Sequence, residues 1–391
     1  MFDPDRFITD RLRAIDASGI RRVFDLAAGL ERPVNLSIGQ PHFDVPQPVK
    51  DAAVKAIQDG FNSYTVTQGA DRLRRHCTRL IADEFADWKP ASDGGTFEML
   101  ITSGVSGGLV LALLTCAGPG DEVLMPDPYF VMYKHLVTMA GATPVLVDTY
   151  PDFQLTTERV EPLVTDRTKM LLFSSPSNPT GVVTSDASCR QLVELADRHD
   201  LLLVSDEIYN EFCYEKIERP PASGVWRAAS PAQYSDRLLL LRGFSKTYAM
   251  TGWRLGYAAG PAPIIEQMTK LQQYTFVCAP SMVQFAGVTA LEQDMSAHVR
   301  DYHAKRDRLV ERLSPAFELT TPGGAFYAFP RVPERLGLTG TQFVERAIDR
   351  NLLIIPGNVF SNRDSHIRIS YACDDDELER GLDILLNLAL G

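Results

Sequence analysis

Short apolar runs alternate with amphipathic stretches over most of the chain from about residue 96. Each run has the length of a strand, whereas residues 186–199 place several apolar side chains along one side of a helix. Strands that alternate with helices predict an α/β fold with a mostly parallel sheet covered by helices on both faces. The predicted strands are 98–102, 122–125, 144–147, 169–173, 201–205, 237–241 and 254–259.

The pattern changes after about residue 290. Residues 296–313 are amphipathic at helical spacing, and "GGAFYAFP" (323–330) predicts a strand after a glycine turn. This part predicts a smaller α+β domain, against which the N-terminal residues fold. The expected division is an N-terminal segment of the small domain (1–48), a large cofactor-binding domain (49–290) and a C-terminal small domain (291–391). The proline-rich residues 218–226 predict a loop.

Composition excludes several classes of protein. The chain has 391 residues, of which 45% are hydrophobic and 23% charged, as in soluble globular proteins. A net charge of −11 argues against a nucleic-acid-binding surface. The longest apolar run, 109–117, is too short for a membrane helix. The six cysteines are dispersed without a C-x-x-C pair, which indicates reduced thiols, no zinc site and a cytoplasmic location.

Unusual polar, aromatic and glycine residues follow five of the predicted strands. The segments are "SGVSGG" (103–108), "PDPYF" (126–130), "SSPSNPTG" (174–181), "DEIY" (206–209) and "RGFSK" (242–246). Ligands of parallel sheets bind outside the carboxyl ends of the strands. The five segments therefore predict a single composite site.

Residues 104–108 form a literal G-x-S-x-G around Ser106, between a predicted strand and a predicted helix. This context fits the nucleophile elbow of a serine hydrolase. It also fits a helix start whose amides bind a phosphate, with the serine as a donor only. The hydrolase would need a late histidine, and His298, His303 and His366 are available, although no HGGG-type oxyanion segment precedes the serine.

Two other segments allow alternatives when each is taken alone. Asp206 follows four apolar residues, as in a Walker B strand, but the chain has no P-loop; capping of the next helix is the plain structural interpretation. Lys246 stands between small and hydroxyl residues at the expected mouth of the sheet, eight positions before Arg254. A lysine desolvated there can act as an amine nucleophile, whereas a surface lysine and arginine would be inert.

Residues 242–260, "RGFSKTYAMTGWRLGYAAG", resemble the active-site lysine motif of class I and II aminotransferases, which are pyridoxal-phosphate enzymes of the aspartate aminotransferase fold type. The resemblance covers roughly residues 35–370. It implies an amino-acid aminotransferase that uses pyridoxal 5'-phosphate and a 2-oxo acid acceptor in two half-reactions. Further segments match the family's patterns in the family's order: "LSIGQPHFDVP" (36–46), "NSYTVTQG" (62–69), "SPSNPTG" (175–181), "SDEIY" (205–209), "PGNVFS" (356–361) and "IRIS" (367–370).

The resemblance implies catalytic roles for three residues. Lys246 would form an imine with the cofactor aldehyde and afterwards carry the proton between substrate and cofactor. Asp206 would stand beside the pyridine nitrogen and favour its protonated, electron-withdrawing form. Tyr209, together with Asn178, would hydrogen-bond the phenolic oxygen of the cofactor.

The resemblance also implies which residues donate hydrogen bonds to the cofactor phosphate. Arg254 resembles the family's guanidinium clamp, and Ser245, the amides of Val105 and Ser106, and the Ser106 hydroxyl could add hydrogen bonds. The position three before the lysine, often serine in this family, is Gly243 here. One expected hydroxyl is therefore missing.

The resemblance further implies which residues contact the cofactor ring and which contact the substrate. Phe130 is expected to stack on the cofactor ring, with Tyr129 as the alternative. Arg368 resembles the residue that binds the substrate α-carboxylate bidentately, assisted by Gly39 and Asn178.

Tyr64 matches a tyrosine that in the family reaches the cofactor phosphate from the neighbouring subunit, which implies a homodimer with shared active sites. The segment 272–281, where an arginine for dicarboxylate substrates would be sought, contains none; this favours neutral, aromatic or broad specificity. A lyase or decarboxylase on the same scaffold is the alternative reaction, although "MTGWRLGY" (250–257) resembles the transaminase branch more.

Overall fold

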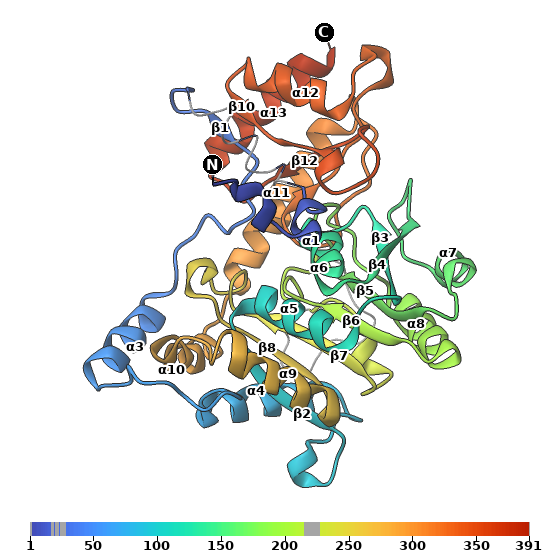
Figure 1. Ribbon diagram of the computed structural model, residues 1–391. Helices are drawn as coiled ribbons and strands as arrows, with labels where there is room; N and C mark the ends of the chain where they lie inside the picture. The colour runs from blue at the N-terminus through green and yellow to red at the C-terminus, as the bar shows by residue number, and fades with distance from the viewer. Residues whose placement is uncertain (1, 17–18, 20–22, 24–28, 215–226, 391) are drawn as a thin grey trace.

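A seven-stranded sheet forms the centre of the larger part of the protein (Figure 1). The computed structural model describes residues 2–16, 19, 23, 29–214 and 227–390, so the predicted loop at 218–226 lies outside the described residues. The strands of the sheet are β2 (Phe97–Thr102), β3 (Glu122–Asp127), β4 (Thr143–Asp148), β5 (Thr168–Ser174), β6 (Leu202–Asp206), β7 (Leu238–Gly243) and β8 (Gly256–Pro261).

The strand order across this sheet is β2-β8-β7-β6-β5-β3-β4. β8 runs antiparallel to both of its neighbours, and the other pairs are parallel, which confirms the predicted mostly parallel sheet. The predicted start of β8 at residue 254 was two residues too early. Arg254 has a left-handed backbone, with φ of +56°, and ends a short 3-10 turn (Thr251–Trp253), so the extended chain begins only at Gly256.

Alternate side chains of the strands enter two different cores, because successive residues of a strand point to opposite faces. In β7, Leu238 and Leu240 join one core, and Leu239 and Leu241 join the other. Helices α5, α6 and α9 cover the second face, and α3, α4, α8 and α10 pack into the first core. Their bounds are α3 Gln47–Gln58, α4 Asp71–Glu84, α5 Gly104–Cys116, α6 Met132–Ala140, α8 Asp186–His199, α9 Ala262–Thr275 and α10 Ser281–Ala290.

The smaller part joins the two ends of the chain. β1 (Val34–Asn35) pairs in parallel with β10 (Leu352–Leu353), so the N-terminal segment folds against the C-terminal part as predicted. A second sheet has the order β11-β12-β9 with antiparallel pairing. Its strands and the helices of this part are β9 (Tyr327–Ala328), β11 (Ile355–Pro356), β12 (Ile367–Ser370), α11 (Ser296–Leu313), α12 (Gly340–Ile348) and α13 (Asp375–Leu390). The boundaries at residues 48 and 290 stay predictions.

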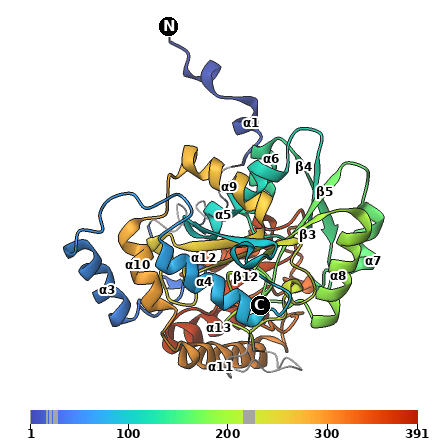
Figure 2. The same ribbon diagram turned by 90° about the horizontal axis from the view of Figure 1, so that it is seen from below.

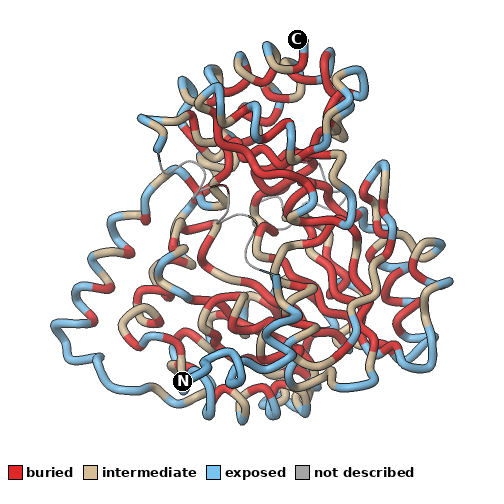
Figure 3. Tube along the Cα trace, turned by 45° about the horizontal axis from the view of Figure 1, so that its top comes forward, coloured by how far each residue is buried: buried red, intermediate tan, exposed pale blue. Residues whose placement is uncertain are grey.

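A continuous core connects the two parts. Tyr209 and Phe212, which follow β6, pack with Phe326 and Tyr327 of the smaller part, and Figure 3 shows buried chain running through this junction. Among the described residues, there are also the short α-helices α1 (Asp10–Arg13) and α7 (Thr157–Val160). Figure 2 shows the residues before α1 leading away from the body of the molecule. Within the described residues, every helix is too short or too polar to cross a membrane.

Candidate active site

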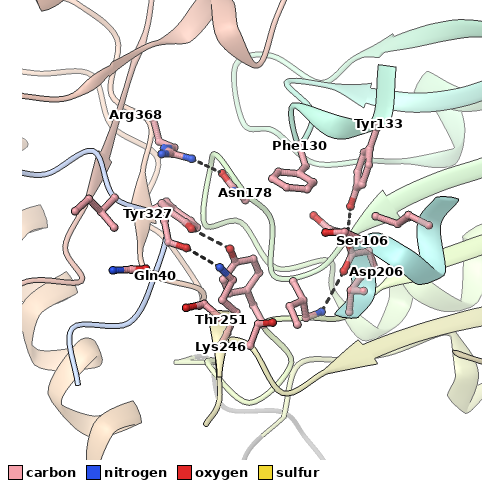
Figure 4. A pocket seen from close by; sticks show the side chains of 18 of the residues that line it. Gln40, Ser106, Phe130, Tyr133, Asn178, Asp206, Lys246, Thr251, Tyr327 and Arg368 are labelled. Atoms are coloured by element: carbon pink, nitrogen blue, oxygen red, sulfur yellow. Dashed lines mark hydrogen bonds between the residues drawn. The ribbon is translucent and has the colours of Figure 1, made fainter. Parts of the chain in front are cut away.

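A pocket of about 370 Å³ lies where β2, β3, β5, β6 and β7 end, and all five polar segments contribute to it (Figure 4). The connection from β7 to the antiparallel β8 starts and finishes at the same edge of the sheet, which is why Lys246 and Arg254 both line the pocket. The predicted residues that line it are Gly39, Val105, Ser106, Phe130, Asn178, Asp206, Tyr209, Ser245, Lys246, Arg254 and Arg368.

Lys246 reaches across the pocket to the N-terminal segment. Its Nζ donates a hydrogen bond to the carbonyl oxygen of Gly39, 2.5 Å away, and lies 5.7 Å from the ring centre of Tyr209. Burial, with the charges of Arg368 and Arg254, lowers the pKa of Lys246 to about 8. A lysine in these surroundings has a substantial neutral fraction near physiological pH and can act as a nucleophile and as a base.

Asp206 lies at the base of the pocket and is 3% exposed. Tyr133, on α6, donates to its Oδ2 at 2.8 Å, and the backbone amide of Ile208 donates to Oδ1 at 3.2 Å. Burial raises the pKa of Asp206 to about 6, while the two hydrogen bonds act in the opposite direction. A cation beside this carboxylate would hold it in the ionised form.

The start of α5 and Arg254 together form an anion-binding corner. Helix N-termini offer unpaired amides and a partial positive charge, and here Val105 and Ser106 are the second and third residues of the helix. A Cβ on Gly104 would lie only 2.7 Å from Nη2 of Arg254, so the guanidinium rests against the helix start. Gly104 also has φ of +71°, a conformation that strongly favours glycine.

The position of Gly243 is crowded. A Cβ there would lie 3.0 Å from both Ile208 Cδ1 and Val105 Cγ2. A serine would have to displace these side chains, which gives a packing reason for the missing hydroxyl at the anion-binding corner.

Arg368 lies on the opposite side of the pocket from Asp206 and is 2% exposed. Nη1 donates to Asn178 Oδ1 at 3.1 Å, and Nη2 donates to the carbonyl oxygen of Ser37 at 2.7 Å. Its guanidinium lies 4.8 Å from the ring centre of Tyr327 and 4.7 Å from that of Phe360. Nη1 and Nη2 each carry a second N–H group, so the guanidinium retains donors for an anionic ligand.

The aromatic residues considered for the site differ in their position relative to the pocket. Phe130 lines the pocket, whereas Tyr129 lies outside its lining and donates its backbone amide to Phe360 at 2.8 Å. Tyr64 is 83% exposed and lies away from this pocket within its own chain.

Ser106 has no histidine beside it in the pocket formed by the described residues. His298 stacks on Phe43 with ring centres 3.8 Å apart, and His366 stacks on Phe329 at 5.1 Å. His303 stacks on Tyr214 at 5.1 Å. The three histidines considered for a hydrolase are therefore occupied in packing, and the hydrolase interpretation gains no support.

Comparison with known proteins decides the family. The family model described as "Aminotransferase class I and II" matches residues 31–385. The chain belongs to the class I and II aminotransferases. It is thus an amino-acid aminotransferase that depends on pyridoxal phosphate, as the resemblance implied.

Relatives of this aminotransferase match it over almost its whole length. It is 37% identical to the putative aminotransferase YugH of Bacillus subtilis and 34% identical to aromatic-amino-acid aminotransferase 2 of Thermococcus litoralis, with 96% of both chains covered in each case. The solved structure of Thermus thermophilus aspartate aminotransferase with maleate has a TM-score of 0.89 and 31% identity, covering 97% of this chain and 99% of that one.

The pocket of the aminotransferase fits the groups of the cofactor. The anion-binding corner suits a phosphate, the buried carboxylate of Asp206 suits a protonated ring nitrogen, and Lys246 offers an amine to an aldehyde. Its volume lies within the range of sites for small ligands.

Two residues in or beside these contacts were missed by sequence reasoning. Tyr133 donates to Asp206, and Tyr327 lines the pocket between Tyr209 and Arg368. Tyr327 stands in "GGAFYAFP" (323–330), which predicted a strand, and Tyr133 lies three residues after "PDPYF" (126–130). The whole of the segment 323–330 is buried, and the ring of Tyr327 lies in the core of the smaller part.

Proposed function

We propose that the pocket holds pyridoxal phosphate and the amino-acid substrate through the residues that the resemblance implied. Val105, Ser106, Ser245 and Arg254 would hold the phosphate, with Tyr64 of a second subunit completing the site. Phe130 would cover the ring, Asp206 would pair with its nitrogen, and Asn178 and Tyr209 would hydrogen-bond its phenolic oxygen. Arg368, with Gly39 and Asn178, would bind the substrate carboxylate. The convergence of Lys246, Asp206, Arg254 and Arg368 in a single pocket carries this proposal.

When bound, pyridoxal phosphate withdraws electrons from the substrate α-carbon and carries the amino group between the two half-reactions. The protein supplies binding, orientation and proton transfer. Arg368, fixed by Asn178 and by the Ser37 carbonyl, can orient the substrate by its carboxylate. Lys246, with its lowered pKa, can remove the α-proton and return it as the acid. The charge on Asp206 would favour the protonated form of the ring nitrogen.

An absorbance spectrum tests the cofactor assignment. Protein loaded with pyridoxal phosphate should show a visible band that shifts when an amino acid is added, and Lys246→Ala should bind the cofactor without covalent attachment and without turnover. A wild-type protein that takes up no pyridoxal phosphate would refute the proposal. Release of ammonia without a 2-oxo acid acceptor would instead favour the lyase alternative.

Neutral or aromatic amino acids are the proposed donors. Arg254 and Arg368 are the two arginines among the described residues that line the pocket. Arg254 is proposed to bind the cofactor phosphate and Arg368 the substrate α-carboxylate, so neither is left for a carboxylate in the substrate side chain. Ile38, Leu109 and Phe130 add apolar side chains to a lining that also has uncharged polar residues such as Gln40 and Thr251. The value of kcat/KM should be at least about tenfold higher for phenylalanine than for aspartate. A preference for aspartate would contradict this assignment.

A homodimer is the proposed assembly. Large apolar side chains are exposed on α3 and in the segment after it: Val54 (52%), Ile57 (49%), Phe61 (42%), Tyr64 (83%) and Val66 (64%). Such a group of exposed apolar side chains is typical of an interface. Sedimentation equilibrium should give twice the chain mass of 43.4 kDa, and Ile57→Asp should shift the protein toward monomer.

A cytoplasmic location is part of the same proposal, and the dispersed cysteines support it.

A further inference from the structure

Tyr327 is a fully buried tyrosine whose hydroxyl meets the hydroxyl of Tyr209 inside the pocket. The two oxygens lie 2.9 Å apart, and the rings are perpendicular, with centres separated by 5.7 Å. Tyr327 is 0% exposed and lines the pocket beside Arg368 (Figure 4). It belongs to β9 and pairs there with Ser370 of β12, the strand that carries Arg368.

The surroundings fix the hydroxyl of Tyr327 in place. A Cβ on Gly39 would lie 2.9 Å from this oxygen, so the N-terminal segment closes over it. The ring is held by the guanidinium of Arg368, 4.8 Å from its centre. Among the described residues, Tyr209 is the hydrogen-bond partner of this hydroxyl.

The pair of hydroxyls holds two protons, and a single proton lies between the two oxygens. If Tyr209 donated to Tyr327, the proton of Tyr327 would lack an acceptor among the described residues, and Tyr209 could not donate elsewhere. If Tyr327 donates, the proton of Tyr209 is free to point into the pocket. The second arrangement satisfies both donors once an acceptor stands beside Tyr209, and it strengthens each bond through cooperativity.

We propose that Tyr327 is a positioning residue that donates its hydroxyl proton to Tyr209 and thereby directs the Tyr209 proton toward the phenolic oxygen of the cofactor. The inference rests on the proposed role of Tyr209. Burial raises the pKa of both tyrosines, which keeps both hydroxyls protonated and able to donate. Tyr327 would thus favour the negatively charged phenolic oxygen without touching the cofactor.

Tyr327→Phe tests the proposal, because it removes the hydroxyl and keeps the ring against Arg368. The readout is the pH midpoint at which the visible absorbance of the substrate-free, pyridoxal-phosphate-loaded enzyme changes. A weaker hydrogen bond to the phenolic oxygen should raise this midpoint by roughly 0.3 to 1 pH unit. Tyr209→Phe should raise it further, and Tyr209→Phe/Tyr327→Phe should match Tyr209→Phe alone, since Tyr327 acts through Tyr209.

Tyr214→Phe is the matched control, because the hydroxyl of this buried tyrosine donates to the Ala325 carbonyl and lies outside the pocket lining. Its midpoint should equal that of the wild type. An unchanged midpoint in Tyr327→Phe, or a double variant that shifts beyond Tyr209→Phe, overturns the role of Tyr327. A wild-type protein without any visible band overturns the proposed function itself.

Discussion

At the scale of single residues, the environment of Lys246 predicts how uptake of pyridoxal phosphate depends on pH. Its pKa is lowered to about 8, by burial first and then by two arginine charges. The neutral amine is the nucleophile, so its fraction grows as pH rises through the lowered pKa. The rate of visible-band formation in the cofactor-free protein should therefore rise up to about pH 8 and then level off, as stopped-flow absorbance can measure.

The Lys246→Ala variant provides the baseline for that measurement and should form no such band at any pH. An uptake rate that keeps climbing toward the ordinary lysine pKa of about 10.4 would show that the pocket does not lower the pKa.

Residue types and their order were enough to predict most of the site. Lys246 and Asp206 each allowed another interpretation when taken alone, and it was the resemblance over many segments that brought Lys246, Asp206, Arg254 and Arg368 together. All four line the pocket. Tyr133 and Tyr327 could not be predicted in this way, because an apolar ring in an apolar segment gives the same signal whether or not its hydroxyl has a polar partner.

At the scale of elements, the start of α5 depends on the absence of a side chain at Gly104. An alanine there would carry its Cβ to 2.7 Å from Arg254 Nη2, at φ of +71°. Displacing the guanidinium should weaken pyridoxal phosphate binding about tenfold or more, the equivalent of one charged hydrogen bond. Absorbance titration with the cofactor measures this change.

Gly94 offers a matched control, since its φ is +77° and nothing lies within 4 Å of an added Cβ. Gly94→Ala should cost about 1 kcal/mol of stability through backbone strain and leave cofactor affinity unchanged. Equal affinities in Gly104→Ala and Gly94→Ala would exclude the proposed contact between the helix start and Arg254.

The pairing of β6 with β7 is supported by a buried ion pair behind the pocket. Arg242 donates to Glu207 Oε2 from Nε at 3.0 Å and from Nη2 at 2.8 Å, and both Arg242 and Glu207 are almost fully buried. The same guanidinium also donates to Glu84 of α4, at 2.7 and 2.8 Å. Arg242→Met would leave Glu207 without a counter-charge and take one of the partners of Glu84, and should cost about 3 to 5 kcal/mol. Urea unfolding measures the loss.

Arg237→Met is the comparison for that experiment. Arg237 stands just before β7, its side chain is 69% exposed, and it pairs with Asp197 at 3.4 Å. An exposed pair of this kind contributes about 0 to 1 kcal/mol. Equal losses in Arg237→Met and Arg242→Met would mean that burial of the Arg242 pair does not matter for stability.

Periodicity located all seven strands of the large sheet but could not give their order. β8 lies next to β7 as it does in the sequence, but β2, the first strand of this sheet, lies at the edge beside β8 and far from β3. The antiparallel direction of β8 has no local signal either. Which distant strands pair is decided by the packing of the whole sheet. The local sequence pattern therefore predicts the strands themselves but not which strands lie next to each other.

At the scale of the whole molecule, the pocket lies between the two parts of the chain. Asp206 ends β6 and Lys246 follows β7 of the large sheet, whereas Gly39 and Arg368 belong to the N-terminal and C-terminal segments that pair in the smaller part. A substrate bound to Arg368 would therefore contact both parts. Because Tyr64 is exposed and lies outside the pocket of its own chain, the proposed dimer brings a third contribution from a second subunit.

Mixing two inactive variants tests that third contribution. Lys246→Ala lacks the catalytic amine, and Tyr64→Ala should lose most activity through weak phosphate binding if the tyrosine acts across the interface. In a mixed dimer, the subunit with Tyr64→Ala keeps its own Lys246 and receives an intact Tyr64 from the other subunit, so one of the two sites is complete. After dissociation and reassociation of an equal mixture, activity should rise to about a quarter of the wild-type value, since half of the dimers are mixed and each has one complete site. If activity stays at the mean of the two separate variants while sedimentation shows that mixed dimers have formed, Tyr64 does not act in the active site of the partner.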